Sequence, residues 1–533
     1  MSALTTPFLL LHDDDDVAVT TRELLPGDDV ALDGTPLRVD ERMPQGHKIA
    51  RHPLPAGAPV RKYGQVIGVT TAPVTAGAHV HAHNLGYVEG ERDHETATVH
   101  TELPAPEGPR PTFRGYRRAD GRVGTRNYLA ILTSVNCSAS TAQMIARQFP
   151  ASALRAYPNV DGVIALTHQS GCGLVPSSEG GQMLLRTLRG YAAHPNIGAV
   201  LVVGLGCEMI APSQLSVREG RAFVGMPTVG APPAPRDPLL ADIPTDTLVR
   251  SLTIQDVGGV RATAKAGIAA VEELLPLLDA RRREDVDVSE LVLALNCGGS
   301  DGYSGITANP ALGWASDRLV AYGAASVLAE TPEVFGAEHL LTRRATTPEV
   351  AARLLERIDW WKAYTAAGGG SLDNNPSPGN KAGGLTTILE KSLGAVAKGG
   401  QADLSAVYEY AERIEPHAGF AFMDTPGYDP VSVTGLVAGG ANVVVFTTGR
   451  GSVFGCRPTP SIKVATNTQM YERMRDDMDL DAGRIIDGTA SLEQVGQEIF
   501  DLILAVASGE QTVSEELEIG GEEFVPWHVG AVT

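Results

Sequence analysis

Four apolar segments, each followed by a glycine-containing turn, constrain the fold of this chain more than any other feature. The segments YLAILTSV, GVIALTH, AVLVVGLG and LVLALN are apolar runs of strand length, and stretches of helical pattern separate them. Strands that alternate with helices predict a parallel sheet covered on both faces, because parallel strands need long crossover connections. The sequence therefore predicts an α/β protein.

The first part of the chain has a different pattern. Turn signals such as Pro26-Gly27, Pro44-Gln45-Gly46 and Pro55-Ala56-Gly57 recur at short intervals through residues 12–86, with short apolar or alternating pieces between them. This spacing is typical of a small all-β module. Residues 87–113 are polar and proline-rich without an apolar period, which predicts a solvated linker.

A charged run over residues 279–287 ends one helical pattern and precedes LVLALN, which marks a further boundary. A chain of 533 residues is long enough for about three domains. The predicted organisation is a β module over 1–86, a linker over 87–113, and two parallel-sheet α/β domains over 114–285 and 286–533.

The charge balance excludes two classes of partner. The chain has 43 Lys+Arg and 63 Asp+Glu, a formal net charge of −20, which repels phosphate backbones and anionic lipid. We therefore expect no nucleic acid and no membrane partner. The N-terminus lacks the basic region of a signal peptide, and the five cysteines are widely spread, which favours a cytoplasmic protein. The sequence leaves open whether the chain forms a homo-oligomer.

Four of the cysteines each follow an apolar segment. Ligands bind at the carboxyl edge of parallel sheets, so four thiolates placed there could meet at one iron ion or one iron–sulfur cluster. The alternative is that each cysteine is a small buried core residue. Cys456 follows a different kind of turn and is not expected to bind metal. The candidate metal ligands are Cys137, Cys172, Cys207 and Cys297.

Histidines are concentrated in the β module and the linker, since eight of the thirteen fall in the first hundred residues. His79, His81 and His83 alternate, so a strand would point all three to one face. Such a face could bind a divalent metal or transfer protons, and the alternative is a solvated sheet face. His12 precedes four aspartates, which are typical of a solvated turn, and His47 follows the turn PQG.

Two loops of the last domain are candidates for anion binding. The rigid loop NNPSPGNK ends at Lys381, which could fix a carboxylate or act as a base if desolvated, although an exposed lysine is the commoner outcome. TTGRGSVFG follows a buried strand and offers backbone N–H groups together with Arg450. The second loop is not a Walker loop, because no G-K-[ST] follows, and GLGCE lacks the third glycine of a dinucleotide fingerprint, so nucleotide binding is not expected.

The chain closely resembles the altronate and galactarate dehydratase family of sugar-acid hydro-lyases. The matching strings are HDDDDVAV, PQGHK, RKYGQVIG, HVHAHN, GRVGTRNYL, HQSGCG, VVGLGCE, CGGSDGYSGITANPALG, NPSPGNKAGGLTT and TTGRGSVFG. The resemblance implies that residues 12–86 form a β-clip module like that of antifreeze-like proteins, followed by a two-part catalytic region. It also implies dependence on iron, with Mn²⁺ as an alternative, and a six-carbon sugar-acid substrate that yields a 2-keto-3-deoxy acid.

The strings HVHAHN and NPSPGNKAGG resemble the altronate branch more than the galactarate branch, so D-altronate is the expected substrate and galactarate the alternative. The same resemblance allows a lyase that expels sulfite from a sulfonated hydroxy acid such as sulfolactate. A sugar-acid sensor without catalysis is the non-enzyme alternative. Turnover to a keto acid separates these functions.

Dehydration across C2–C3 of a sugar acid needs a base, stabilisation of an enediolate, and an acid for the departing hydroxyl. A metal supplies the second and assists the third. Iron bound by the four cysteines is the first choice, and a mononuclear site of His12, His47 and either His81 or His83 is the rival. The expected catalytic residues are His12, His47, Lys48 and Lys381, and the expected substrate-binding residues are His81, His83, Asn380 and Arg450.

Overall fold

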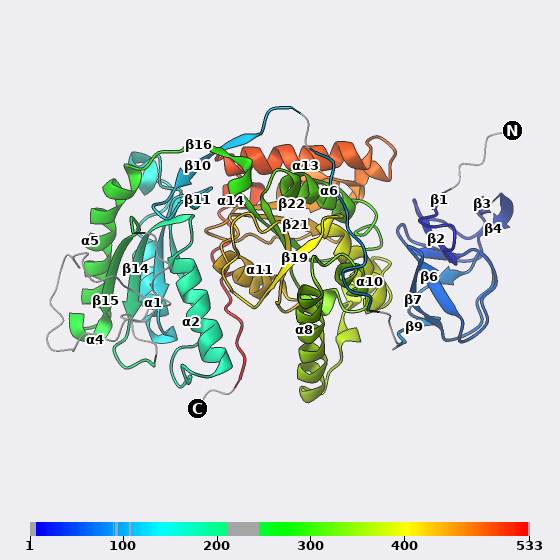
Figure 1. Ribbon diagram of the computed structural model, residues 1–533, viewed down its shortest axis with the longest axis horizontal. Helices are drawn as coiled ribbons and strands as arrows, with labels where there is room; N and C mark the ends of the chain where they lie inside the picture. Colours follow the sequence, from blue (N-terminus) through cyan, green and yellow to red (C-terminus); the bar gives the residue numbers. More distant parts are fainter. Residues whose placement is uncertain are drawn as a thin grey trace.

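The computed structural model describes residues 7–32, 34–88, 90, 94–105, 108–209 and 245–530. The chain forms an N-terminal β module, a second domain with a four-stranded sheet, and a C-terminal domain with a seven-stranded sheet (Figure 1). The predicted α/β class with an N-terminal β module is confirmed. In the part of the chain that is described, no helix is both long and apolar enough to cross a bilayer.

The β module is built from short antiparallel strands. Its sheets have the orders β1-β2-β5-β8, β3-β4 and β6-β7-β9. Gly46 lies at φ +80°, in the left-handed region that favours glycine, and this turn leads directly into β5. The strands are β1 (Phe8–Leu9), β2 (Val17–Thr20), β3 (Asp29–Leu32), β4 (Thr35–Arg38), β5 (Lys48–Ala50), β6 (Pro59–Lys62), β7 (Gln65–Thr70), β8 (His79–Val80) and β9 (Leu85–Gly86).

The segment between the β module and the second domain is docked on the C-terminal domain. Within residues 94–105, the Ala97 backbone N–H donates to the Thr342 carbonyl at 3.0 Å. His94 Nε2 lies 3.0 Å from a carboxylate oxygen of the buried Glu338. Most residues of this stretch are exposed, and backbone and side-chain hydrogen bonds attach it to the neighbouring domain.

The second domain has a parallel sheet of order β13-β12-β14-β15, covered on both faces. Leu129 and Ile131 pack with residues of α1 and α5, whereas Ala130 and Leu132 belong to the core on the other face, which includes α2. The elements are β12 (Tyr128–Thr133), α1 (Ala139–Ala146), β13 (Gly162–Leu166), α2 (Glu179–Ala192), β14 (Ile197–Gly204), β15 (Leu248–Thr253), α4 (Ile254–Val257) and α5 (Val260–Asp279).

A small antiparallel sheet joins the start of the second domain to its end. Its order is β11-β10-β16, formed by β10 (Thr112–Arg117), β11 (Val123–Gly124) and β16 (Glu284–Asp287). Helix α13 of the C-terminal domain packs against β10. The chain therefore leaves the second domain close to where it entered and continues into the C-terminal sheet.

The C-terminal domain has an all-parallel sheet of order β19-β20-β18-β17-β21-β22-β23. Every residue of β17 is buried, as the apolar run LVLALN predicts. The strands are β17 (Val292–Cys297), β18 (Ala325–Leu328), β19 (Leu404–Tyr408), β20 (Phe420–Met423), β21 (Val443–Thr448), β22 (Ser461–Ala465) and β23 (Leu480–Asp481).

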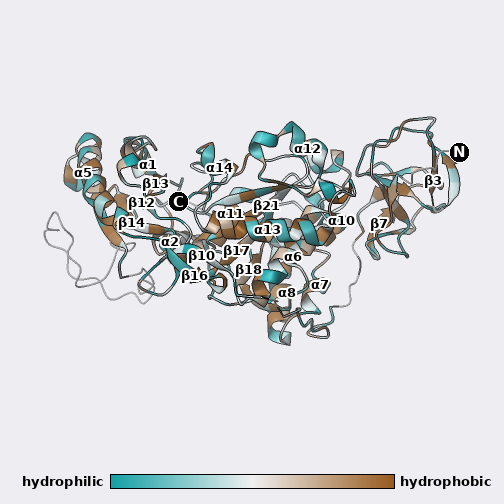
Figure 2. Ribbon diagram, turned by 90° about the horizontal axis from the view of Figure 1, so that it is seen from above, coloured by the Kyte–Doolittle hydropathy of each residue, from teal (hydrophilic) through white to brown (hydrophobic). Residues whose placement is uncertain are grey.

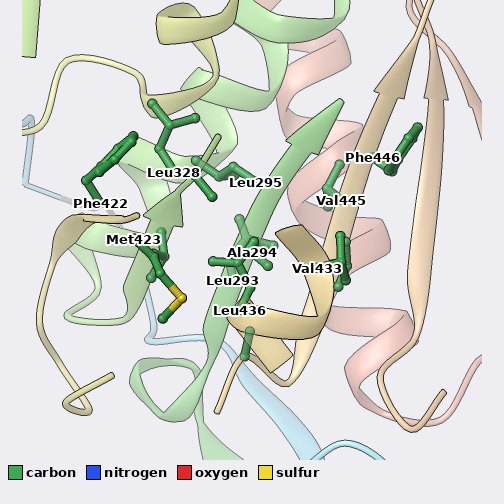
Figure 3. Close-up of a cluster of buried hydrophobic side chains, with 14 of the residues drawn as sticks. Leu293, Ala294, Leu295, Leu328, Phe422, Met423, Val433, Leu436, Val445 and Phe446 are labelled. Carbon is green, nitrogen blue, oxygen red and sulfur yellow. The ribbon is translucent and has the colours of Figure 1, made fainter. Parts of the chain in front are cut away.

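Helices surround this sheet, and the apolar colouring concentrates on the central strands (Figure 2). Leu293, Leu295, Leu328 and Phe422 form part of the core between strands and helices (Figure 3). The helices are α6 (Ala308–Ala321), α7 (His339–Thr342), α8 (Pro348–Ala367), α9 (Pro378–Ala382), α10 (Ile388–Val396), α11 (Asp429–Ala438), α12 (Thr468–Arg473), α13 (Leu492–Ala507) and α14 (Val513–Glu516).

Candidate active site

The candidate site lies where the strand order of the seven-stranded sheet reverses. The chain runs outward from β17 to β18 on one side and later returns to add β21 on the other. In open α/β sheets, ligands bind outside the carboxyl ends of the strands at this point. Cys297 ends β17, Glu330 follows β18, and Arg450 follows β21, so all three lie at that edge.

A cavity of about 390 Å³ is present at this edge, within the size range of small-molecule sites. Residues from the ends of β17 and β21, from the loop before α9, and from α10 and α11 line it. Its lining contains ionisable and amide side chains, which suit a hydroxylated anionic ligand. The polar lining residues include Glu333, Asn375, Ser377, Asn380, Lys391, Asp429 and Arg450.

Lys391 and Arg450 are the two cations of the cavity lining, and they differ in their partners. Lys391 Nζ donates to Glu333 Oε1 at 2.6 Å and to Asn375 Oδ1 at 3.0 Å. Burial favours the neutral amine, but the Glu333 carboxylate raises the pKa of Lys391 above its ordinary value. Among the described residues, Arg450 forms no ion pair and is exposed. The cavity thus offers one guanidinium free to meet a carboxylate.

Asp429, the first residue of α11, is the acid of the cavity that titrates near neutrality. Burial and the nearby Glu333 carboxylate raise the pKa of Asp429 to about 7. A Cβ at position 298 would lie only 2.3 Å from Asp429 Oδ2, so glycine is needed there for the carboxyl group to reach the strand end. A carboxyl group with this pKa can donate a proton at neutral pH.

Cys297 does not join the other cysteines. Its sulfur lies 2.7 Å from Lys398 Nζ, and burial raises the pKa of the Cys297 thiol to about 12 even though Lys398 opposes the shift. Cys297, Glu330 and Glu333 place ligand atoms within 4.8 Å of one another, but the ammonium group of Lys398 already supplies positive charge there. Cys297 thus lies apart from the other three predicted ligands, in a separate sheet.

The other three predicted metal ligands lie on the second domain. Cys137, Cys172 and Cys207 follow β12, β13 and β14, and all three are exposed, whereas Cys297 belongs to the C-terminal sheet and is buried. The common feature that the sequence reveals, a cysteine after each strand, is present in two different sheets. A shared position relative to a strand does not by itself bring side chains from separate sheets together.

The β module contacts the C-terminal domain beside the cavity through buried charges. Lys48 Nζ donates to the Gly384 carbonyl at 2.6 Å and to Glu390 Oε2 at 2.8 Å, and Lys62 Nζ lies 2.9 Å from Glu390 Oε1. Strand β7 and helix α10 lie side by side at this junction (Figure 1). Burial favours the neutral acid, but the two ammonium groups hold the pKa of Glu390 below its usual range.

Three histidines of the β module gather at the same junction. His47 Nδ1 lies 2.9 Å from His79 Nε2, and the rings of His47 and His81 are 5.0 Å apart between centroids. His47 Nε2 also lies 3.4 Å from the carbonyl of Ala382. Burial is the main cause that lowers the pKa of His47 and His79 to about 4 and that of His81 to about 3.

These imidazoles have the properties of metal ligands. They stay neutral at physiological pH, each of the three offers a nitrogen within 4.8 Å of the others, and His81 Nδ1 is buried without a hydrogen-bond partner. Neutral imidazole nitrogens are common ligands for divalent iron and manganese. We refer to His47, His79 and His81 as the histidine trio.

Other predicted site residues lie outside this arrangement. His12 is exposed, its ring accepts a hydrogen bond from the Asp14 backbone, and it does not belong to the group formed by His47, His79 and His81. His83 is exposed, and its ring centroid lies 5.5 Å from that of His79. Lys381 lies on α9 but is absent from the cavity lining.

Asn380 and Arg450 both line the cavity, but the backbone N–H groups of the Arg450 loop are already bonded. Asn380 accepts a hydrogen bond from the Ser377 backbone and donates to the carbonyl of Ser300, which fixes the loop before α9. The backbone N–H groups of Gly449 and Arg450 both donate to Gly299. These two N–H groups are therefore not open to an anion, and the Arg450 side chain lines the cavity.

Sequence reasoning missed most of the buried charges. Lys62, Glu390, Lys391, Lys398 and Glu333 are buried, and Asp429 is half-buried. Only α10 gave a usable signal, because Glu390 and Lys391 interrupt an otherwise apolar helical run. A charge inside such a run indicates a paired or functional group, since unpaired burial is costly.

Comparison with known proteins covers nearly the whole chain. Residues 6–87 match the altronate/galactarate dehydratase SAF domain, residues 115–279 the second domain of D-galactarate dehydratase/altronate hydrolase, and residues 288–532 the C-terminal domain of D-galactarate/altronate dehydratase.

Full-length relatives carry two substrate names. The chain is 38% identical to the galactarate dehydratase (L-threo-forming) of Escherichia coli, over 95% of this chain and 94% of that protein. It is 36% identical to the altronate dehydratase of Escherichia coli, over 95% of this chain and 96% of that protein. It is also 32% identical to the (2R)-sulfolactate sulfo-lyase subunit beta of Chromohalobacter salexigens, over 78% of this chain and 96% of that subunit.

Proposed function

Because the chain belongs to the D-galactarate and altronate dehydratase family of sugar-acid hydro-lyases, we propose that it removes water from D-altronate to give a 2-keto-3-deoxy acid. The observation that carries the choice of substrate is the charge of the cavity. We also infer a cytoplasmic location, for which the spread of free cysteines is the support.

The cavity favours one carboxylate over two. Arg450 is its unpaired cation among the described lining residues, while Lys391 is already paired with Glu333. An aldonic acid such as altronate has a single carboxylate, which Arg450 can bind. The second carboxylate of an aldaric acid such as galactarate would meet the acidic groups of Glu333 and Asp429, and like charges in one site are unfavourable.

The lining residues provide an acid, a base and a cation for the reaction. We assign removal of the C2 proton to the Glu333 carboxylate, with the Lys391 ammonium group beside it to stabilise the negative charge that develops. Asp429, whose pKa is about 7, gives its proton to the departing 3-hydroxyl as the C3–O bond breaks. The enol product then takes a proton at C3 and loses its O–H proton, which yields the keto acid.

The iron that the resemblance implies fits the histidine trio better than the four cysteines. His81 Nδ1 is a buried nitrogen without a partner, and the three imidazoles are neutral. We propose that His47, His79 and His81 hold one Fe²⁺ or Mn²⁺ ion. Such an ion supplies Lewis acidity toward carboxylate and hydroxyl oxygens. His47 Nε2 lies 3.4 Å from the carbonyl of Ala382, two residues after Asn380 of the cavity lining, which supports a position of the trio beside the cavity.

A comparison of substrates tests this proposal. Anaerobically purified protein, loaded with Fe²⁺, is given D-altronate, galactarate or (2R)-sulfolactate at equal concentration, and keto acid and sulfite are measured. We expect the highest kcat/KM for D-altronate. A higher kcat/KM for galactarate would overturn the proposal of altronate as the substrate. Release of sulfite from sulfolactate, without keto acid from either sugar acid, would overturn the proposed dehydration.

Two arginine variants test the role of the cavity cation. Arg450→Met should raise KM for altronate with a smaller effect on kcat, because it removes a charge that binds the carboxylate before and during the reaction. Arg473→Met, at an exposed position of α12, is the matched control and should leave both constants unchanged. Equal effects of the two changes would exclude Arg450 as the carboxylate ligand.

A further inference from the structure

The three exposed cysteines of the second domain lie together at one edge of its sheet. We propose that Cys137, Cys172 and Cys207 bind an iron–sulfur cluster, at a site separate from both the cavity and the histidine trio. This inference stands on the second domain alone and does not depend on the substrate of the C-terminal domain.

Exposure distinguishes these cysteines from core residues. Cysteine is ordinarily among the most buried residue types, and Cys297 and Cys456 follow that rule. The remaining three are all exposed. Exposed free thiols are liable to oxidation, so three of them on one edge are better explained as ligands than as packing residues.

The sheet brings the three thiols to the same side. Strand β12 pairs in parallel with both β13 and β14, so the carboxyl ends of the three strands point to one edge. Cys137 lies in the 3-10 turn Asn136–Ser138 that follows β12. Cys172 comes after β13, and Cys207 comes three residues after the end of β14 at Gly204.

Hydrogen bonds tie the three cysteine-bearing loops to one another. The Asn136 backbone N–H, next to Cys137, donates to the Ser170 carbonyl at 2.9 Å. The Met209 backbone N–H donates to the Gly171 carbonyl, next to Cys172, at 3.3 Å. The Cys172 loop is therefore bonded to both of the other cysteine-bearing loops, so the three thiols have a shared framework.

Two further contacts hold this framework close. Gly171 has φ +102°, and a Cβ there would lie 2.4 Å from the Ser134 carbonyl oxygen, so the loop approaches β12 as only glycine allows. The Glu208 carboxylate accepts hydrogen bonds from Ser134 Oγ at 2.7 Å and from the Gly206 N–H at 2.6 Å. Glu208 directly follows Cys207, so its bond to Ser134 ties the Cys207 loop to the end of the strand that leads to Cys137.

The three thiols do not form a set close enough to ligate one ion together, whereas a cluster needs a wider set. Two sulfurs that are each about 2.3 Å from one tetrahedral ion lie about 3.8 Å apart. Among the described residues, no group of three potential ligand atoms within 4.8 Å of one another includes Cys137, Cys172 or Cys207. A cluster places several irons and sulfides between its thiolates and so spans a wider set.

A hydrogen-bond donor lies near one of the three thiols. Gln255 Nε2 lies 3.8 Å from Cys207 Sγ, as a donor that can bond a ligating sulfur. Each thiol would lose its proton to solvent on binding. Three protein thiolates are one fewer than the four that such clusters commonly have, so one iron would keep a position for a non-protein ligand.

Reconstitution tests the proposal without reference to activity. The full chain is incubated anaerobically with Fe²⁺ and sulfide, desalted, and analysed for iron, acid-labile sulfide and visible absorption. We expect bound sulfide and iron–sulfur absorption, both lost in Cys137→Ser, Cys172→Ser and Cys207→Ser. Cys456→Ser is the control outside the site, and His79→Ala should keep the sulfide while it loses only iron bound by the histidine trio.

A thiol-protection measurement guards against misfolded variants. In the reconstituted native chain, Cys137, Cys172 and Cys207 should resist alkylation, and removal of iron with a chelator should expose them. Absence of bound sulfide in the native chain, sulfide retained after all three substitutions, or equal alkylation with and without reconstitution would each overturn the proposal.

Discussion

Lys48 of the β module and Glu390 of helix α10 form a salt bridge of 2.8 Å in which neither side chain is exposed. Lys62 shares the same carboxylate at 2.9 Å. The module is thus attached to the C-terminal domain by one anion between two cations, next to the histidine trio and to the loop that lines the cavity. Attachment of the module and formation of the site therefore depend on the same contacts.

The first prediction concerns this ion cluster. Glu390→Gln leaves two buried ammonium groups without a carboxylate and should cost about 3–5 kcal/mol in the free energy of unfolding. Lys48→Met should cost less, because Lys62 still neutralises Glu390. Denaturant unfolding measures both values. Lys362→Ala, which breaks the exposed pair with Asp359, is the control and should change stability by about 0.5 kcal/mol or less.

The second prediction concerns the pH dependence of turnover. Burial and Glu333 raise the pKa of Asp429 to about 7, so its carboxyl group is protonated below that pH and loses its proton above it. If Asp429 is the general acid, kcat should fall as pH rises through about 7. Asp429→Asn should lower kcat by about 10²–10⁴-fold and remove this alkaline limb. A limb that persists in the variant would assign the titration to another group.

The third prediction concerns metal affinity. An imidazole with an ordinary pKa near 6.5 is protonated in mild acid and then cannot bind metal. Because burial lowers the pKa values of the histidine trio to about 3–4, Mn²⁺ bound there should remain as pH falls from 8 to 5. Electron paramagnetic resonance of free and bound Mn²⁺ measures this.

Two variants complete the metal test. His81→Ala should abolish Mn²⁺ binding, whereas His52→Ala, at an exposed position of the same module, should not. Loss of Mn²⁺ between pH 7 and 6 in the native chain would indicate a site made of exposed histidines instead.

The fourth prediction concerns residues 94–105. Because the Ala97 N–H and the His94 side chain are bonded to the C-terminal domain, this stretch should resist limited proteolysis under native conditions. Glu338→Ala removes the hydrogen-bond partner of His94 and should increase cleavage there. Rapid cutting of the native chain within 94–105 would contradict the docked arrangement.

The sequence predicts features that local patterns determine. The run LVLALN is long enough and apolar enough to specify the buried strand β17, and the turn signals of residues 12–86 specify a module of short strands. The position of each cysteine at or shortly after a strand end also follows from the neighbouring sequence alone, so the sequence predicts it.

The sequence does not predict which distant groups meet. Lys398 lies against Cys297 from 101 positions along the chain, and burial at this place raises the pKa of the Cys297 thiol to about 12 although the ammonium group opposes the shift. The alternating histidines are a similar case. Only His79 lies in β8, and His81 is in the following turn, where its backbone N–H donates to Asn84 Oδ1. The trio forms because His47 reaches His79 across 32 positions, and not because one strand face carries three histidines.

The most direct test of the central claim is the reaction of D-altronate in D₂O, followed by proton nuclear magnetic resonance with anaerobic, Fe²⁺-loaded protein. The account predicts a 2-keto-3-deoxy acid with one solvent deuterium at C3, formed by the native chain and about 10²–10⁴-fold more slowly by Asp429→Asn. Unchanged altronate under conditions in which the protein is folded and holds iron would contradict it, as would equal rates for the two proteins.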